Sequence, residues 1–413
     1  MTGIAHFGEI TATVPQIVAT VEPQAHFRDF LGSRRITGDL PRAGERFRLT
    51  HSGRGAIYQV LRALPGGVGN TVLVPSFHCP TVVDPVVHSG YRPVYYRIRR
   101  DLSIDIADLS RKLGSDVAAV VVINFFGFPA DLEALLAVRA RHRFLLIEDC
   151  AHSFLATDPL RLAGGRGDVD IYSFRKLVAM GTGGGARSNL EGLRLPPSRS
   201  LVSWKHVLML SKRLAEQAIE NSSWSLVGRA YGFLERTRVS LKRRPAPPTP
   251  GARAKIIYTF EAQLDAAAMP SVSRWILARS DLSRIVRLRQ RNYRRLATRI
   301  KPTAMSRPLF PVLPPQTCPW AFPLLIPGRE RFDLQLRGLG VPVFTFGETL
   351  MESVFEAEPE LVDDARYLST SLLLVPIHQD LEEHRMDEFA HTINTFFMSA
   401  AQRPASVILD ARD

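Results

Sequence analysis

The sequence predicts an α/β protein with a doubly wound, mainly parallel sheet and a smaller C-terminal α+β domain. Apolar runs of strand length alternate regularly with helical patterns from about residue 52 onward. Several of these runs are apolar almost throughout, which is typical of strands that helices cover on both faces. A chain of 413 residues is long enough for two to three domains.

The first predicted helix follows the sequence HSGRG, because Ile57, Val60 and Leu61 recur on one helical face. A second helical pattern occupies residues 130–142 and separates two apolar runs. The pattern predicts strands at residues 71–74, 93–96, 116–124, 144–149 and 168–174.

Beyond residue 190 the composition changes, since proline-rich pieces flank a basic stretch at residues 191–255. Helical periodicity then covers residues 273–300, and a last helix is expected at 387–397, with strands at 321–326 and 371–377 between them. We therefore expect an N-terminal segment (1–48), a large cofactor-binding α/β domain (49–190), a basic helical insertion (191–255) and a small C-terminal domain (256–413).

The positive charge is concentrated in the predicted insertion. Residues 191–255 hold 13 basic and four acidic side chains, which accounts for +9 of the net charge of +13. No nucleic-acid motif accompanies this charge, so we expect no nucleic-acid partner. The simplest interpretation is a lid or a dimer-packing helix pair. Attraction of a nucleotide diphosphate is one alternative, and peripheral contact with anionic lipid through Trp204 is another that the sequence does not favour.

The three cysteines, Cys79, Cys150 and Cys318, are too few and odd in number for a disulfide framework. The longest apolar stretch, residues 117–128, is interrupted by Asn124 and too short for a membrane span. The expected location is therefore the cytoplasm.

Polar residues follow several predicted strands at the end where sites form in open α/β sheets. They include His78, Cys79, Asn124, Asp149, His152, Ser173 and Lys176. Gly53, Arg54 and Gly55 open the first helix, whose free N–H groups and dipole favour a phosphate.

This set of residues suits pyridoxal phosphate. The cofactor needs an amine with a lowered pKa that forms a Schiff base, an acid that keeps the pyridine nitrogen protonated, and donors for its phosphate. Lys176 and Asp149 fit the first two roles, and only seven of the 53 basic residues are lysines. The alternatives are a solvated loop lysine and a helix-capping acid.

The motifs HSGRGAIYQVLRAL, NFFGFPAD, FLLIEDCAHS and DVDIYSFRKLVAMGTGGGA stand in a characteristic order and spacing. In this respect the chain resembles the DegT/StrS-type sugar aminotransferases, pyridoxal-phosphate enzymes of fold type I. The resemblance runs over residues 49–186 and more weakly from 269 to the end. It implies a homodimer, with Lys176 as Schiff-base lysine and acid/base, Asp149 at the pyridinium, His152 near the ring hydroxyl, and Ser173 with the N–H groups of Arg54 and Gly55 at the phosphate.

The sequence departs from the family pattern at several positions. The Ser-Phe-Arg-Lys turn is two residues shorter than usual before Lys176, and Arg54 replaces a threonine. Cys79 stands where an aromatic residue normally stacks on the ring, which leaves His78 or Phe77 for that face. The asparagine motif that the family's second subunit contributes has no clear match at residues 260–273.

Other site types are less well supported. A zinc site built from His51, His78, Cys79, Asp149, Cys150 and His152 lacks a spaced ligand frame, so no metal is expected. Residues 181–186, GTGGGA, neither directly follow an apolar strand nor open a helix, as a dinucleotide site requires. The sequence contains no P-loop and no G-x-S-x-G motif.

The resulting hypothesis is an aminotransferase that moves an amino group from an amino acid, glutamate in the first instance, to a nucleotide-linked keto-sugar for glycan precursor synthesis. One alternative changes the acceptor to a non-sugar carbonyl. The other is a catalytically silent relative that binds a glycan precursor or a partner.

Overall fold

The computed structural model describes residues 21–31, 44, 46–65, 69–156, 162–198, 201–221 and 260–401. Much of the predicted N-terminal segment (1–48) and of the basic insertion (191–255) lies outside these ranges. Among the described helices, none combines the length and the apolar character that crossing a bilayer demands.

A seven-stranded sheet forms the larger part of the described chain, in the order β1-β7-β6-β5-β4-β2-β3. The strands β2 to β6 pair in parallel, whereas β7 runs antiparallel to both of its neighbours. Their bounds are β1 Phe47–Thr50, β2 Thr71–Pro75, β3 Arg92–Tyr96, β4 Val117–Ile123, β5 Leu145–Asp149, β6 Val169–Ser173 and β7 Gly184–Ser188.

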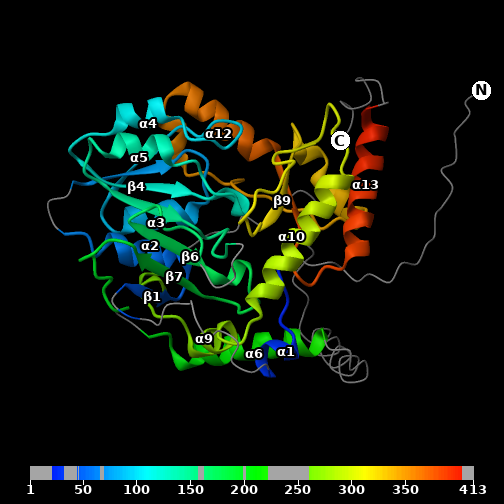
Figure 1. Cartoon of the computed structure of the whole chain (residues 1–413), viewed down its shortest axis with the longest axis horizontal. Helices are drawn as coiled ribbons and strands as arrows, with labels where there is room; N and C mark the ends of the chain where they lie inside the picture. The colour runs from blue at the N-terminus through cyan, green and yellow to red at the C-terminus, as the bar shows by residue number, and fades with distance from the viewer. Residues whose placement is uncertain are drawn as a thin grey trace, which may run out of the picture.

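Helices cover this sheet on both faces, with α2 and α3 on one side and α4 and α5 on the other (Figure 1). This covering explains why β2, β4 and β6 are buried at every position. The helices are α2 Gly53–Leu61, α3 Pro80–His88, α4 Ile106–Lys112 and α5 Glu133–Arg139.

A second, antiparallel sheet of three strands, in the order β10-β9-β8, packs with the helices of the C-terminal part (Figure 1). The long helices α10 and α13 contact each other beside it. The strands are β8 Arg307–Pro308, β9 Ala321–Leu325 and β10 Leu372–Pro376, and the helices are α9 Ser271–Leu277, α10 Leu282–Arg299, α11 Asp333–Gly338, α12 Pro359–Ser371 and α13 Glu383–Ala401.

The structure confirms the predicted fold class and refines several elements. The helical pattern at 273–300 divides into α9 and α10, because Asp281 caps the second helix by accepting from the N–H of Arg284 at 2.9 Å. The described part of the insertion contains α6, Trp204–Glu220. Within α6, Trp204 and Leu208 are 70% and 60% exposed, whereas Leu214 is buried.

Two further short helices complete the described chain: α1 Phe27–Leu31 and α8 Ala262–Asp265. Helix α1 contacts α6 and α9, and α8 contacts α2. The segment that follows the predicted insertion therefore packs against a helix that covers the large sheet. The proposed domain boundaries at 48, 190 and 255 stay predictions.

Candidate active site

The register of the central strands gives one face of the sheet its site residues. Ile123 pairs with Asp149, and Asp149 pairs with Ile171, so all three side chains point to the same face. Ser173, two residues farther along β6, shares that face. All four line a cavity of about 240 Å³. This cavity lies at the carboxyl ends of the parallel strands, where the sequence places the site.

Lys176 reaches the same cavity from the turn that follows β6. A 3-10 turn over Phe174–Lys176 reverses the chain, with the N–H of Leu177 donating to the carbonyl of Phe174 at 3.1 Å. The Nζ atom of Lys176 lies 4.7 Å from the centroid of the Trp320 ring. The shortened loop therefore still brings Lys176 and Asp149 to one cavity.

Burial sets the protonation of both groups. It lowers the pKa of Lys176 from 10.5 to about 8, although the charges of Cys79 and Asp149 oppose the shift. Burial also raises the pKa of the Asp149 carboxyl, an effect that Lys176 and the Ala151 N–H reduce. The Ala151 N–H donates to Asp149 Oδ1 at 2.9 Å. An amine with a lowered pKa is suited to nucleophilic attack on a carbonyl.

The start of α2 supplies donors to the cavity. Ser52, Gly53 and Arg54 line it, and the N–H groups of Gly53 and Arg54 have no partner among the described residues. Gly184 lies against this turn so closely that a Cβ atom there would come within 2.4 Å of the Gly53 nitrogen. The hydroxyl of Ser173 also has no hydrogen-bond partner in the described part of the chain. Such a set of open donors at a helix N-terminus favours a phosphate.

Of the two backbone N–H groups predicted to bind the phosphate, that of Arg54 is open and that of Gly55 is engaged within the protein. The Gly55 N–H donates to Ser52 Oγ at 3.0 Å, and Gly55 is not part of the cavity wall. The Arg54 guanidinium makes two contacts of 3.0 Å with the buried carboxylate of Asp265. Arg54 therefore joins α2 to α8, and its charge is matched within the protein.

His152 lines the cavity as a neutral ring. Its Nδ1 atom accepts the Phe126 N–H at 3.2 Å, so in the neutral ring the proton sits on Nε2. Burial lowers the pKa of His152 well below 6.5, and the charge of Lys176 adds to this shift. Trp320 stacks on the ring with a centroid distance of 4.2 Å. His152 thus presents a donor, which suits a ring hydroxyl or phenolate oxygen.

His78 and Asn124 lie away from the cavity, which corrects the cofactor contact expected for them. His78 is fully buried, with Nδ1 2.9 Å from the Pro75 carbonyl and its ring stacked on Tyr95. Asn124 uses its amide on Glu148 and its carbonyl on the Ala130 N–H. Both side chains leave the strand ends toward packed structure instead of the open face.

Neither of the residues expected to stack on the cofactor ring, His78 or Phe77, lines the cavity. Phe77 is fully buried and packs against Phe125 and Phe346 at centroid distances of 5.6 and 5.5 Å. Cys79 itself lines the cavity, and its sulfur accepts the Thr81 hydroxyl at 3.2 Å. Phe346, from the C-terminal part, is the aromatic ring that reaches the cavity wall.

A fully buried arginine, Arg289, binds the backbone of the turn that carries Lys176. Arg289 on α10 donates to the carbonyls of Lys176 at 3.3 Å and Trp320 at 3.0 Å, and to Gln379 Oε1 at 3.1 Å. Gln379 in turn donates to the carbonyl of Leu177 at 2.9 Å. The C-terminal part therefore fixes both the turn that carries Lys176 and the ring beneath its amine.

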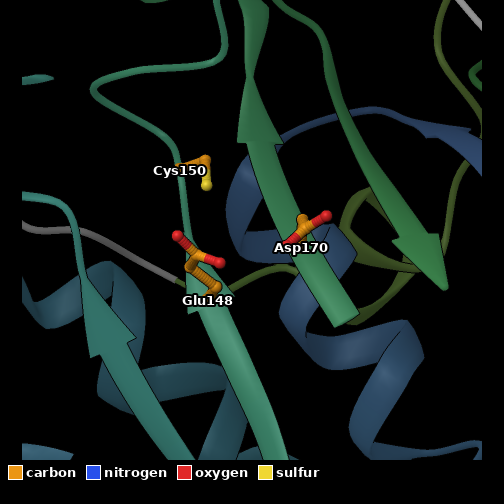
Figure 2. Close-up of side chains that lie close together, drawn as sticks. All are labelled: Glu148, Cys150 and Asp170. Carbon is orange, nitrogen blue, oxygen red and sulfur yellow. The ribbon is translucent and has the colours of Figure 1, made fainter. Parts of the chain in front are cut away.

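The opposite face of β5 and β6 carries a cluster of Glu148, Cys150 and Asp170 (Figure 2). It is the group of ligand-type side chains that the described residues bring within 4.8 Å of one another. Of the six residues considered for a zinc site, Cys150 is a member of this group, and the other five are not. Burial raises the pKa of the Cys150 thiol, with the nearby carboxylates adding to the shift.

Hydrogen bonds within the protein already match the two carboxylates of this cluster. Glu148 accepts from Asn124 and from the N–H groups of Arg166 and Gly167 at 3.0 to 3.3 Å. Asp170 accepts from Arg187 at 2.8 Å and from Asn189 at 2.8 Å, among others. The cluster is therefore a hydrogen-bonded network on the face of the sheet opposite the cavity. The glycine-rich residues 181–186, considered for a dinucleotide site, lead into β7 and open no helix.

Comparison with known proteins agrees with this site. Residues 47–191 match the DegT/DnrJ/EryC1/StrS aminotransferase family. The matched segment is about a third of the chain. The match covers β1 to β7 and therefore includes Asp149, Ser173 and Lys176.

Two curated relatives illustrate the likeness. A UDP-N-acetyl-3-dehydro-alpha-D-glucosamine 3-aminotransferase of Acidithiobacillus ferrooxidans is 31% identical over 137 residues, 32% of this chain and 37% of that protein. An L-glutamine:2-deoxy-scyllo-inosose aminotransferase of Streptoalloteichus tenebrarius is 28% identical over 267 residues, 57% of this chain and 61% of that protein. The matched segments thus span about two to three fifths of these relatives' lengths.

Solved structures show the same fold over a larger part of the chain. The aminotransferase TlmJ from Streptoalloteichus hindustanus superposes with a TM-score of 0.62 at 17% identity, covering 88% of both chains. The fold is therefore that of fold type I aminotransferases, including the C-terminal part that the family match does not reach.

The family indicates pyridoxal phosphate as the cofactor, and the cavity fits this group. Asp149 and Lys176 lie where an acid and an amine are needed, and the start of α2 offers open donors for a phosphate. Sequence reasoning missed four residues around the cavity: His51, Trp320, Phe346 and Arg289. Only His51 carried a local signal, because it directly precedes the Ser-Gly pair that opens α2.

Proposed function

We propose that this chain is a pyridoxal-phosphate-dependent aminotransferase that passes an amino group from an amino acid to a nucleotide-linked keto-sugar. The observation that carries the proposal is the shared cavity of Lys176 and Asp149, beside open donors at the start of α2. The match of residues 47–191 to the aminotransferase family supports the reaction type.

Each residue has a defined task in this reaction. Pyridoxal phosphate, when bound, supplies an aldehyde that condenses with amines and a ring that withdraws electrons. Lys176, with a pKa near 8, presents a neutral amine in an appreciable fraction of molecules at neutral pH and then carries the substrate's α-proton. Asp149 would hold a proton on the ring nitrogen, and His152 would donate from Nε2 to the ring oxygen.

The substrate class rests on the relatives. One is named for a UDP-linked amino-sugar precursor, which supports a nucleotide-linked keto-sugar as acceptor and a role in glycan precursor synthesis. The other is named for a cyclitol ketone, which supports the alternative of a non-sugar carbonyl. We favour glutamate as donor, and glutamine belongs in the same assay because that relative's name contains L-glutamine.

A homodimer is the proposed assembly, as the family resemblance implies. Sedimentation of the full chain with bound cofactor checks it. A single species of twice the chain mass of 46.1 kDa is expected, and a species of one chain mass would contradict the proposal.

The decisive experiment compares the full chain with Lys176→Ala. The unaltered chain should take up added pyridoxal phosphate with a visible absorption band and convert it to the amine form with glutamate or glutamine. Lys176→Ala should lose the band and at least about 10³-fold of the rate. Absence of cofactor uptake by the unaltered chain would instead support the silent relative.

Acceptors are then tested separately from donors. A nucleotide-linked keto-sugar should regenerate the aldehyde form of the cofactor faster than a free keto acid or a cyclitol ketone. Equal or faster reaction with the cyclitol ketone would overturn the sugar assignment and leave the aminotransferase assignment intact.

A further inference from the structure

An unmatched polar atom lies in the wall of the cofactor cavity. The Nε2 atom of His51 is buried and has no hydrogen-bond partner, although His51 lines the cavity with Ser52 and Gly53. A buried donor or acceptor without a partner is unfavourable, and such groups in native proteins commonly mark the position of a ligand atom.

The backbone of His51 is held firmly at this position. Its N–H donates to the Ala267 carbonyl at 2.9 Å, and its carbonyl accepts the Thr182 hydroxyl at 2.6 Å. The imidazole lies edge-on to His206 of α6, with a centroid distance of 5.4 Å. Three separate segments therefore determine where the imidazole points.

His51 belongs to the phosphate end of the cavity. It is joined directly to Ser52 and Gly53, whose backbone opens α2, and Gly53 lies against Ser173, since a Cβ atom on Gly53 would be 3.3 Å from the Ser173 Cβ. Asp149 lines the same cavity and would pair with the ring nitrogen of the bound cofactor.

The other side chains at this end leave a place for one more donor. Arg54 is bound to Asp265, and Ser52 Oγ accepts the Gly55 N–H. Among the described residues, the hydroxyl of Ser173 and the His51 imidazole are the side-chain groups that remain unmatched here.

We propose that His51 is a phosphate-binding residue of this chain, which donates from Nε2 to the phosphate of pyridoxal phosphate. This inference rests on the proposed function, because it assumes that the cofactor occupies the cavity. His51 supplies a side-chain donor at the turn where Arg54, bound to Asp265, is engaged within the protein.

The test compares two ligands that differ only in the phosphate. Binding of pyridoxal phosphate and of pyridoxal to the cofactor-free full chain is followed by the visible band, for the unaltered chain and for His51→Leu, His51→Gln and His384→Asn. His51→Leu removes the donor, whereas glutamine places an amide N–H at nearly the reach of Nε2. His384 is exposed and lies outside the cavity, so His384→Asn is the control.

We expect His51→Leu to weaken binding of pyridoxal phosphate about tenfold or more, as loss of one hydrogen bond to a charged group would do. Glutamine should restore most of that loss, and pyridoxal should bind all four proteins alike. The ³¹P resonance of the bound cofactor should move in His51→Leu and stay in His384→Asn.

Two results would overturn the proposal. Unchanged affinity for pyridoxal phosphate in His51→Leu would exclude a phosphate contact, and an equal loss for pyridoxal would show a purely structural role. If the leucine variant does not fold, His51→Asn replaces it, since asparagine is polar but too short to reach the phosphate. Failure of the unaltered chain to bind pyridoxal phosphate would contradict the proposed function itself.

Discussion

Glu148 and Asp149 are neighbours in β5, yet their carboxylates face opposite sides of the sheet. Glu148 lies beside Cys150 and Asp170 on the face opposite the cavity (Figure 2). Donors of the protein match both carboxylates of this group. Asp149 faces the cavity with Lys176, and on that side His51 and Ser173 keep unmatched polar atoms.

The difference shows how to separate structural from functional polar groups in a buried setting. Both faces bury carboxylates, so burial alone does not distinguish them. On one face the hydrogen bonds are complete, which contributes to stability. On the other face they are incomplete and surround an open volume, as expected where a ligand completes them.

The largest expected effect is on the cavity side. Asp149→Asn should lower the aminotransfer rate about 10³- to 10⁴-fold, because the amide cannot hold a proton on the ring nitrogen. The free energy of unfolding should change little. Single-turnover rates and urea unfolding measure the two quantities.

Glu148→Gln is the matched control for this change, one residue away in the same strand. It should lower the stability and leave the rate within about threefold. If Glu148→Gln lowered the rate as strongly as Asp149→Asn, the contrast between the two faces would not hold.

The second prediction concerns the titration of Lys176. Its amine should react with an acylating reagent in the cofactor-free chain with a midpoint at pH about 8 instead of the usual 10.5. The sign follows from burial, which disfavours the charged form, so the reactive neutral amine appears at lower pH. Mass spectrometry of labelled peptides measures it, with the exposed Lys301 as internal reference. Equal pH profiles for the two lysines would contradict the prediction.

A third, smaller effect is expected behind the sheet. Asp170→Asn should reduce the free energy of unfolding by about 2–3 kcal/mol, because it leaves the half-buried Arg187 without its carboxylate. Urea unfolding measures the loss. Asp116→Asn, at an exposed pair with Arg92, is the control and should unfold like the unaltered chain. If Asp170→Asn lowered the aminotransfer rate without lowering the free energy of unfolding, Asp170 would act in catalysis and not in stability, which would contradict the prediction.

The fourth prediction tests the support of the lysine turn. Arg289→Lys should lower the rate about tenfold, because an ammonium cannot replace the planar fork that contacts Lys176, Trp320 and Gln379. The pH profile of the cofactor's visible band should shift as well, which a change in stability alone would not produce. Arg294→Lys, on the exposed side of the same helix, should behave like the unaltered chain.

The smallest expected effect is the change in melting temperature when zinc is added. Added Zn²⁺ should move the melting temperature by less than about 2 °C, since the carboxylates of Glu148 and Asp170 already have protein donors. Calorimetry with and without a chelator measures the shift. A clear stabilisation that Cys150→Ala abolishes would reveal a metal site at this cluster.

The sequence predicted β2 to β6, because most of these strands are buried on both faces and therefore read as continuous apolar runs. It missed β1 and β7, which are short and carry arginine or glycine residues. It also placed Asp149, Ser173 and Lys176 at one edge, since the carboxyl ends of parallel strands converge there. Side-chain direction was harder: His78 and Asn124 follow strands at the same edge but turn into packed structure.

The contributions from distant segments could not be predicted. Phe346 lines the cavity and Trp320 lies against Lys176, both from the C-terminal part, and nothing local in the sequence links them to Lys176. Arg289 belongs to a helix whose many arginines look solvated in sequence, and only its packing reveals that it is fully buried. Such contacts depend on how the C-terminal part packs against the segment that carries Lys176.

Arg289 and Gln379 bind the backbone of the turn that carries Lys176, so the site depends on two separate segments of the chain. The segment that matches the family ends at residue 191 and contains Lys176. The carbonyls of Lys176 and Leu177 accept hydrogen bonds from Arg289 and Gln379, which lie almost 100 or more positions beyond that end. The position of the Lys176 amine therefore depends on residues outside the matched segment. Engineering of this amine should begin at α10 and the segment around Gln379.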